Sequence, residues 1–246
     1  MPVMTQVKTP GVVGISTYVD YAYHLEMQRT ARAAAGTDGP INQLRVVTVT
    51  LDFHLLIDNL MAGRIADAEE QVAAAATALA AAGADFLVVT SGTTSTLTDR
   101  ARERVEVEFL DLAEAAWWRV GEARRVGLLS TRRAAAGGIF QAAAEARGAT
   151  LLLPRPGTAA QLDEMIFDEL VYGTVSPAAI QLLRDAVAEL AEEGAETVIL
   201  GNTDMTLAAG ALTDLPVPIV DSALAHAQAG AYAALGKPIN GPHGQG

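Results

Sequence analysis

Two short polar turns in this sequence carry residue types that suit binding of a small anion. The stretches 83–91 and 194–202 overlay without a gap, and each reads as helix stop, acidic residue, apolar run and polar turn. The overlaid turns end in Ser91 and Asn202. A hydroxyl and a carboxamide can donate hydrogen bonds to a carboxylate, a carbonyl or a developing enolate, and asparagine cannot act as a base. The pair therefore predicts anion binding and stabilisation more directly than proton abstraction.

Two further turns of this kind are Ser16-Thr17 and Ser130-Thr131, and the runs that precede them, Gly14-Ile15 and 127–129, resemble each other. In open α/β sheets, ligands bind beyond the carboxyl ends of the strands, where small residues let backbone approach a ligand. Each hydroxyl alone is ordinarily a helix cap. Four cap-like turns at corresponding strand ends favour a shared carboxylate site.

The segments around these turns alternate between strand-like and helix-like patterns. Strands are expected over the short β-branched runs 11–15, 44–51, 86–89, 125–129, 150–153, 197–200 and 218–220. Helical spacing and strong helix formers predict helices over 65–82, 100–120, 134–147, 159–172 and 177–193. Because the strands are apolar on consecutive residues, they are typical of parallel sheets buried on both faces. We therefore predict an α/β protein of two pseudo-symmetric, doubly wound parallel-sheet lobes with a cleft between them.

The internal repeat also sets the expected domain organisation. Residues 1–112 together with 221–246 are expected to form one lobe, and residues 113–220 the other. The tail 236–246 has no periodicity and is expected to be frayed. If the halves face each other about a pseudo-twofold axis, Ser91 and Asn202 face one another across the cleft.

Composition limits the class of partner. The 246 residues include 29 acidic and 17 basic side chains, a net charge of -12, which argues against a nucleic acid or an anionic membrane as partner. No apolar run approaches the roughly 20 residues of a membrane span, and the first residues lack the pattern of a secretory signal, so a cytoplasmic location is expected. The chain has no cysteine, which excludes disulfides, thiolate metal ligands and thiolate catalysis.

These turns resemble those of the cofactor-independent aspartate/glutamate racemase family. Family members typically read Cys-Asn-Thr where this chain has Ser91-Gly92-Thr93, and Cys-Thr-Glu where it has Asn202-Thr203-Asp204. The resemblance extends from about Gly11 to Leu235, and includes Leu51-Asp52-Phe53 and, near the end, Asp221 with His226-Ala227. Both positions that carry a catalytic cysteine in the family are therefore occupied by other residues.

The resemblance implies what those positions do in relatives. Two thiols flank the substrate α-carbon, one removing its proton and the other delivering a proton to the opposite face, without a pyridoxal cofactor. Ser91 and Asn202 stand at the thiol positions, while Thr93 and Thr203 stand at contacts to the substrate carboxylate. A thiol ionises with a pKa of about 8.5 and a serine hydroxyl several units higher, so ordinary two-thiol racemisation is excluded. Family members are commonly dimers, which makes a homodimer the expectation.

Three functions stay open at this point. The first is an enzyme acting at the carbon next to a carboxylate of a small amino or dicarboxylic acid derivative by a non-thiol route: decarboxylation, elimination or cyclisation through an enolate-like state. Such an isomerase or lyase would serve amino-acid or secondary metabolism, with Asp52, His54 or Asp204 assisting Ser91. The second is a carboxylate-binding protein without catalysis, and the third is residual racemisation through water or Asp52.

The expected site needs no cofactor and no metal, and its ligand is a small-molecule carboxylate. The residues expected to be catalytic are Ser91, Asn202 and Asp52. Those expected to bind the substrate are Ser16, Thr17, Gly92, Thr93, Ser130, Thr131, Thr203, Asp204 and His226.

Overall fold

The computed structural model describes residues 7–35 and 43–238 of the chain. These residues divide into two units. Unit 1 contains the described residues up to Asp111 and those from His226 onward, and unit 2 runs from Leu112 to Ala225. The bounds expected for the two lobes stay a prediction, and the expected frayed tail lies outside the described residues from position 239 onward.

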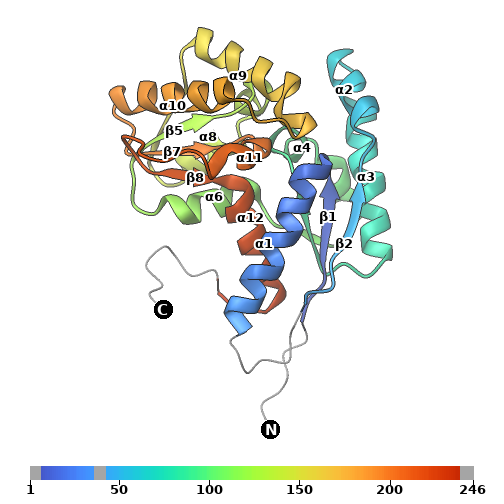
Figure 1. Ribbon diagram of the computed structural model, residues 1–246. Helices are drawn as coiled ribbons and strands as arrows, with labels where there is room; N and C mark the ends of the chain where they lie inside the picture. The colour runs from blue at the N-terminus through green and yellow to red at the C-terminus, as the bar shows by residue number, and fades with distance from the viewer. Residues whose placement is uncertain (1–6, 36–42, 239–246) are drawn as a thin grey trace. The chain divides into compact units, whose positions relative to one another are not determined.

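Unit 1 is built on a parallel sheet with the strand order β2-β1-β3-β4. The strands are β1 (Pro10–Gly14), β2 (Val47–Thr50), β3 (Phe86–Val89) and β4 (Glu108–Phe109). The helices are α1 (Thr17–Ala35), α2 (Phe53–Met61), α3 (Ile65–Ala81), α4 (Gly92–Ser95), α5 (Asp99–Arg104) and most of α12 (Ser222–Ala234). In Figure 1, β1 lies between α1 and α3. Val13 and Val89 belong to the same core cluster as Leu79 of α3, and the alternate residues Val12 and Val88 are buried as well, so the consecutive apolar residues of these strands reflect a sheet covered on both faces.

Unit 2 repeats this arrangement with the strand order β6-β5-β7-β8. Its strands are β5 (Arg125–Leu129), β6 (Thr150–Leu152), β7 (Thr197–Leu200) and β8 (Ile219–Asp221). Its helices are α6 (Leu112–Val120), α7 (Arg132–Ala136), α8 (Ile139–Glu145), α9 (Pro156–Asp168), η1 (Leu170–Tyr172), α10 (Pro177–Glu192), η2 (Thr203–Met205) and α11 (Thr206–Ala209). Leu129 and Leu200 pack with residues of α9 and α10, whereas Leu128 and Ile199 pack with residues of α6 and α8. The prediction of two lobes, each an α/β unit with a parallel sheet, is confirmed.

The internal repeat is visible in equivalent hydrogen bonds. In unit 1 the amide of Thr90 donates to the carbonyl of Val13 (3.1 Å), and in unit 2 the amide of Gly201 donates to that of Leu129 (2.7 Å). At the other end of each strand pair, the acidic residue of the repeat accepts a hydrogen bond from the neighbouring chain segment. Asp85 accepts a hydrogen bond from the amide of Thr9 (2.7 Å), and Glu196 accepts one from the amide of Arg125 (3.0 Å).

The structure corrects one part of the repeat. The hydrogen bonds that align Val13 with Leu129 place Gly14 at the position of Ser130, so the sequence overlay of Gly14 on Gly127 is out of register. Two or three similar residues are too few to fix the register, which the hydrogen bonds to the neighbouring strand establish. Ser16 and Ser130 are therefore not equivalent positions, although both follow the first strand of their unit.

The helix expected over 100–120 is wrong. The chain forms α5, then the edge strand β4, and then α6, because Glu108 and Phe109 pair with Phe86 and Leu87 of β3. The helix expected over 134–147 is interrupted at Gly137-Gly138, where Gly138 has a φ of 76° that a helix cannot continue through. The helices α1 and α2 and the short helices α4 and α11 were not expected, although the buried residues Val19, Tyr23, Met27 and Ala31 follow a spacing of four that indicates α1.

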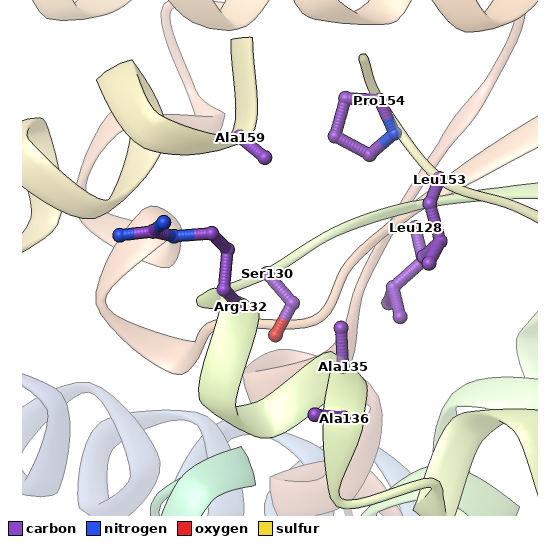
Figure 2. Close-up of a pocket in the computed structure, with 8 residues that line it drawn as sticks. All are labelled: Leu128, Ser130, Arg132, Ala135, Ala136, Leu153, Pro154 and Ala159. Atoms are coloured by element: carbon purple, nitrogen blue, oxygen red, sulfur yellow. The ribbon is translucent and has the colours of Figure 1, made fainter. Parts of the chain in front are cut away.

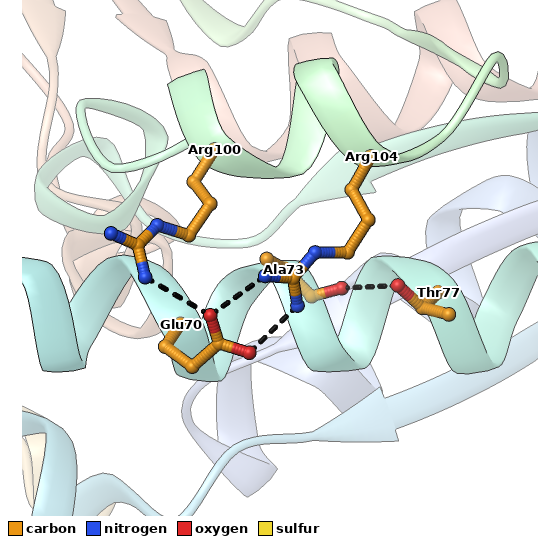
Figure 3. A network of polar contacts seen from close by, with 5 residues as sticks. All are labelled: Glu70, Ala73, Thr77, Arg100 and Arg104. Atoms are coloured by element: carbon orange, nitrogen blue, oxygen red, sulfur yellow. Dashed lines mark hydrogen bonds and ion pairs between the residues drawn. The ribbon is translucent and has the colours of Figure 1, made fainter.

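An ion-pair network fixes α5 against α3. Arg104 contacts Glu70 through both terminal nitrogens (2.7 and 2.8 Å), and Arg100 adds a third contact (3.1 Å), as Figure 3 shows. The hydrogen bonds from the two guanidinium groups lower the pKa of Glu70 to about 2. Because the three side chains are partly exposed, salt will screen the pairs, and their main effect is to orient α5.

A glycine of β5 provides a test of the close packing in unit 2. A Cβ added at Gly127 would lie 2.8 Å from Cδ1 of Leu190 and 2.9 Å from Cγ2 of Val198, so Gly127→Ala should lower the free energy of unfolding by about 1–3 kcal/mol. The matched control is Gly157→Ala in α9, where an added Cβ meets no atom within 4 Å. Urea denaturation should show the control unchanged or slightly more stable. Equal stability of the two variants would contradict the proposed packing.

Candidate functional site

Ser91 lies directly after the carboxyl end of β3. It is the N-cap residue of the short helix α4, with extended backbone angles (φ -153°, ψ 131°), and its Oγ accepts a hydrogen bond from the amide of Thr94 (3.2 Å). Its side chain is partly exposed. Because Oγ acts as the acceptor in this contact, the hydroxyl proton is available to a ligand.

Asn202 occupies the matching place after β7. It caps η2 with extended backbone angles (φ -91°, ψ 124°), and its Oδ1 accepts a hydrogen bond from the amide of Asp204 (3.1 Å). The side chain is partly exposed, like that of Ser91. While Oδ1 accepts the capping hydrogen bond, the Nδ2 group with its two N–H donors can bind a ligand.

The two positions therefore share a chemical property. Each residue uses its acceptor oxygen to cap a turn, and this leaves hydrogen-bond donors for a ligand. Donors of this kind stabilise carboxylates and enolates, but they cannot remove a proton from carbon. Gly92 and Thr94 are buried in the Ser91 turn, and Thr203 and Asp204 are buried in the Asn202 turn, so both turns are firmly packed.

A buried carboxylate that the sequence prediction missed supports the Ser91 turn. Asp20, in the first turn of α1, is only 8 % exposed. It accepts hydrogen bonds from the hydroxyl of Thr90 (2.7 Å), the hydroxyl of Thr50 (3.0 Å) and the amide of Ile15 (3.2 Å). Burial raises the pKa of Asp20, and these hydrogen bonds partly oppose that shift. The network joins the carboxyl ends of β1, β2 and β3, and Thr90 immediately precedes Ser91. The sequence signal that could have identified Asp20 is an acidic residue one helical turn after Ser16-Thr17.

Asp52 and His54 lie at the start of α2. Asp52 is the N-cap residue of this helix, and its Oδ1 accepts a hydrogen bond from the amide of Leu55 (3.0 Å). His54 is exposed and lies 3.5 Å from Asp58 on the same helix. Both contacts are local, so a catalytic role for Asp52 and an assisting role for His54 stay predictions.

The remaining turn residues have different surroundings. Thr17 is exposed, whereas Ser16 is buried and its Oγ has no hydrogen-bond partner among residues 7–35 and 43–238. Thr131 caps α7, because its Oγ1 accepts from the amide of Ala134 (3.1 Å). Ser130 is buried beside Thr131, and Thr93 is partly exposed beside Gly92. These positions stay candidates for substrate binding.

His226 has no exposed surface, which sets it apart from the other candidates. Its Nδ1 lies 3.0 Å from the hydroxyl of Tyr23, and its Nε2 lies 3.0 Å from the carbonyl of Leu110. The two contacts fit a neutral ring in which Nε2 carries the proton and Nδ1 accepts from Tyr23. Burial lowers the pKa of His226 to about 4. His226 is therefore packed inside unit 1, and its expected contact with the substrate stays a prediction.

Two features are absent from residues 7–35 and 43–238. No group of three or more His, Asp or Glu side chains there is arranged to hold a metal ion. No helix there is long and apolar enough to cross a membrane.

Comparison with known proteins places the chain in a family. The family model for Asp/Glu/hydantoin racemases matches residues 21–230. The chain belongs to the Asp/Glu/hydantoin racemase family, and it is a member without cysteine. The resemblance expected from the two polar turns is thereby confirmed.

Solved structures show the same fold. A protein described as an Asp/Glu racemase from Yersinia pestis is 24% identical with a TM-score of 0.79, and the match covers 93% of this chain and 99% of that one. An aspartate racemase homologue from Pyrococcus horikoshii is 22% identical with a TM-score of 0.72, covering 92% and 99%. An allantoin racemase from Klebsiella pneumoniae is 20% identical with a TM-score of 0.59, covering 96% and 91%. At these identities the similarity establishes the fold and leaves the substrate open.

The burial of His226 predicts a pH dependence of stability. The pKa falls from 6.5 to about 4 on folding, so between these values the unfolded chain binds a proton that the folded chain does not. Stability should therefore fall as the pH drops through this window, by up to about 3 kcal/mol for this residue. Urea denaturation at pH 7 and pH 5 should show a smaller loss for His226→Gln than for the wild type. Equal losses would contradict the assignment.

The Asp20 network makes a second prediction. Asp20→Asn replaces an acceptor of three hydrogen bonds by a group that must place an N–H among their donors, so the free energy of unfolding should fall by about 1–3 kcal/mol. Asp168→Asn, at an exposed position in α9, is the control and should change little. Chemical denaturation measures both. A stable Asp20→Asn variant would show that the network does not hold the ends of these strands together.

Proposed function

We propose that this chain is an enzyme that acts at the carbon next to a carboxylate through an enolate-like state, without a thiol and without a cofactor. The observation that carries the proposal is the matched pair of capping residues Ser91 and Asn202, each with its acceptor oxygen occupied and its donors available. In this proposal, Ser91 and Asn202 each act as a hydrogen-bond donor to an oxygen of a carboxylate or an enolate. Thr93 and Thr203 are the neighbouring substrate contacts.

Among the possible reactions, decarboxylation fits these residues best. Elimination and cyclisation both begin with removal of a proton, and neither Ser91 nor Asn202 can serve as an unassisted base. Decarboxylation begins with cleavage of the carbon–carbon bond. Carbon dioxide leaves, the electron pair stays on the substrate as an enolate, and a proton from solvent finally adds to the α-carbon. The step that needs protein help is stabilisation of the enolate, which hydrogen-bond donors supply.

Binding without turnover is the second candidate, and a specific observation favours it. Both Ser91 and Asn202 have a structural task as N-caps, which alone accounts for the presence of such residues at these positions. A protein of this kind would bind small carboxylic acids and release them unchanged.

Product analysis separates the two candidates. The purified chain is incubated in deuterated water with 2-substituted malonates, succinate and both enantiomers of aspartate, and followed by proton NMR and carbon dioxide release. The proposal expects carbon dioxide and a product with deuterium at the carbon that lost its carboxylate. Thermal stabilisation by an acid without any product or exchange would reject it in favour of binding alone. Enantiomer interconversion that disappears in Asp52→Asn would instead support residual racemisation.

Substitutions test the assigned donors. Asn202→Leu keeps the size of the side chain and removes its N–H groups, so kcat should fall about a hundredfold, as when an oxyanion donor is removed. Ser91→Ala should lower kcat by at least about tenfold for the same reason. The control is Ser176→Ala, because Ser176 caps α10 with the same geometry, its Oγ accepting from the amide of Ala179 (3.0 Å).

The control separates capping from catalysis. All three caps should cost about 1 kcal/mol of stability when removed, and only the variants at Ser91 and Asn202 should lose turnover. Turnover that falls equally in Ser176→Ala would show that stability, not the donors, limits activity.

A further inference from the structure

Unit 2 contains a cavity of about 260 Å³ beside the carboxyl ends of β5 and β6. Leu128, Leu153, Pro154, Ala159 and two alanines of α7 form most of its wall, and Figure 2 shows them around the open space. The polar residues at the wall are Ser130 and Arg132. A cavity of this size accommodates a group of a few carbon atoms, smaller than the ligands of ordinary drug-sized pockets.

Ser130 is the polar group placed to bind a ligand here. Its side chain is 5 % exposed, and its Oγ has no hydrogen-bond partner in the described part of the chain. Burying a hydroxyl without a hydrogen-bond partner is unfavourable, so such a group points to a ligand atom or a water molecule that completes its hydrogen bonding. Ser130 lies next to the residues that position Asn202, since Gly201 donates its amide to Leu129 (2.7 Å).

The corresponding place in unit 1 is filled. Gly14 is the counterpart of Ser130, and a Cβ added at Gly14 would lie 2.1 Å from Oδ2 of Asp20 and 2.8 Å from Oγ1 of Thr50. The buried Asp20 network therefore occupies this region of unit 1. In unit 2 the region between the first strand, the second strand and the following helix is open and apolar instead. The opening is thus a property of the residues of unit 2, and the shared strand order does not impose it.

The rim of the cavity carries an ion pair, whereas its interior wall is mostly apolar. Nε of Arg132 lies 2.6 Å from Oδ2 of Asp163, and the amide of Arg132 donates to Oδ1 (3.0 Å), so the terminal guanidinium nitrogens are not used by this pair. The side chain of Arg132 is 66% exposed. A carboxylate placed deeper in the cavity would contact carbon atoms of leucine, proline and alanine, and would lose hydration without an opposite charge.

We propose that this cavity binds the apolar substituent of the substrate. The substrate is then a small malonate-type acid whose central carbon carries a branched aliphatic group of about four carbons, so that one carboxylate leaves as carbon dioxide and the other becomes the enolate. The hydroxyl of Ser130 donates to an oxygen of this substrate at the edge of the cavity. The inference rests on the proposed function, because it assigns a substrate class to the same set of strand ends.

Binding of two acids of similar size tests the inference. The probes are 3-methylbutanoate and succinate, measured by isothermal titration calorimetry with the full chain. 3-Methylbutanoate should bind at least about tenfold more tightly, because its apolar group leaves water whereas the second carboxylate of succinate resists burial. Ala159→Phe, which fills the cavity, and Leu153→Asp, at a half-exposed position of its wall, should each weaken binding of 3-methylbutanoate about tenfold.

The control is Ala142→Phe, at an exposed position of α8 that does not line the cavity, and it should bind 3-methylbutanoate like the wild type. Equal affinity for the two acids, or unchanged affinity in both Ala159→Phe and Leu153→Asp, would overturn the inference. A different result would contradict the proposed function. In that case 3-methylbutanoate binds as expected and responds to the variants, while none of the acids tested for turnover gives a product.

Discussion

The backbone ladder between the first and third strands of each unit is the constraint on which the site depends. Its last hydrogen bonds, from Thr90 to Val13 and from Gly201 to Leu129, bring each polar turn to the carboxyl end of a buried strand. Ser91 and Asn202 follow immediately and cap the next turn. Because buried strands move little, the donor group of each turn is held by a rigid part of its unit. The sheets therefore set the geometry of the two turns, and one residue in each turn sets its chemistry.

The two units share a strand order but differ in what occupies the space beside the first strand. Thr90 contributes a hydroxyl to the buried carboxylate of Asp20, and this network fills unit 1 beside Gly14. Its counterpart Gly201 has no side chain, and the space there is taken by Leu128, whose Cδ1 would lie 2.4 Å from an added Cβ. Leu128 also lines the cavity of unit 2. The space beside the first strand is therefore closed and polar in unit 1 and open and apolar in unit 2, while the strand order stays the same.

Sequence patterns predicted the parallel sheets and the repeat because strands buried on both faces leave continuous apolar runs. They failed where tertiary pairing decides the outcome. Glu108-Phe109 becomes a strand only because the edge of β3 is available, and its residues alone fit the expected helix. The same limit applies to the site. Ser91 and Asn202 follow from the repeat, whereas Asp20 acquires its role from Thr50 and Thr90, which are distant in sequence and adjacent only in the folded sheet.

Having no thiol at the two family positions changes the reactions that these turns can support. A two-thiol site needs a base and an acid of matched pKa, and neither a hydroxyl nor a carboxamide provides the base. What Ser91 and Asn202 retain is the ability to donate hydrogen bonds from fixed positions. Donors alone lower the energy of an enolate but cannot create one from a C–H bond. A reaction in which carbon dioxide departs creates the enolate without a base, which is why loss of the thiols is compatible with catalysis in this proposal and is not simply loss of function.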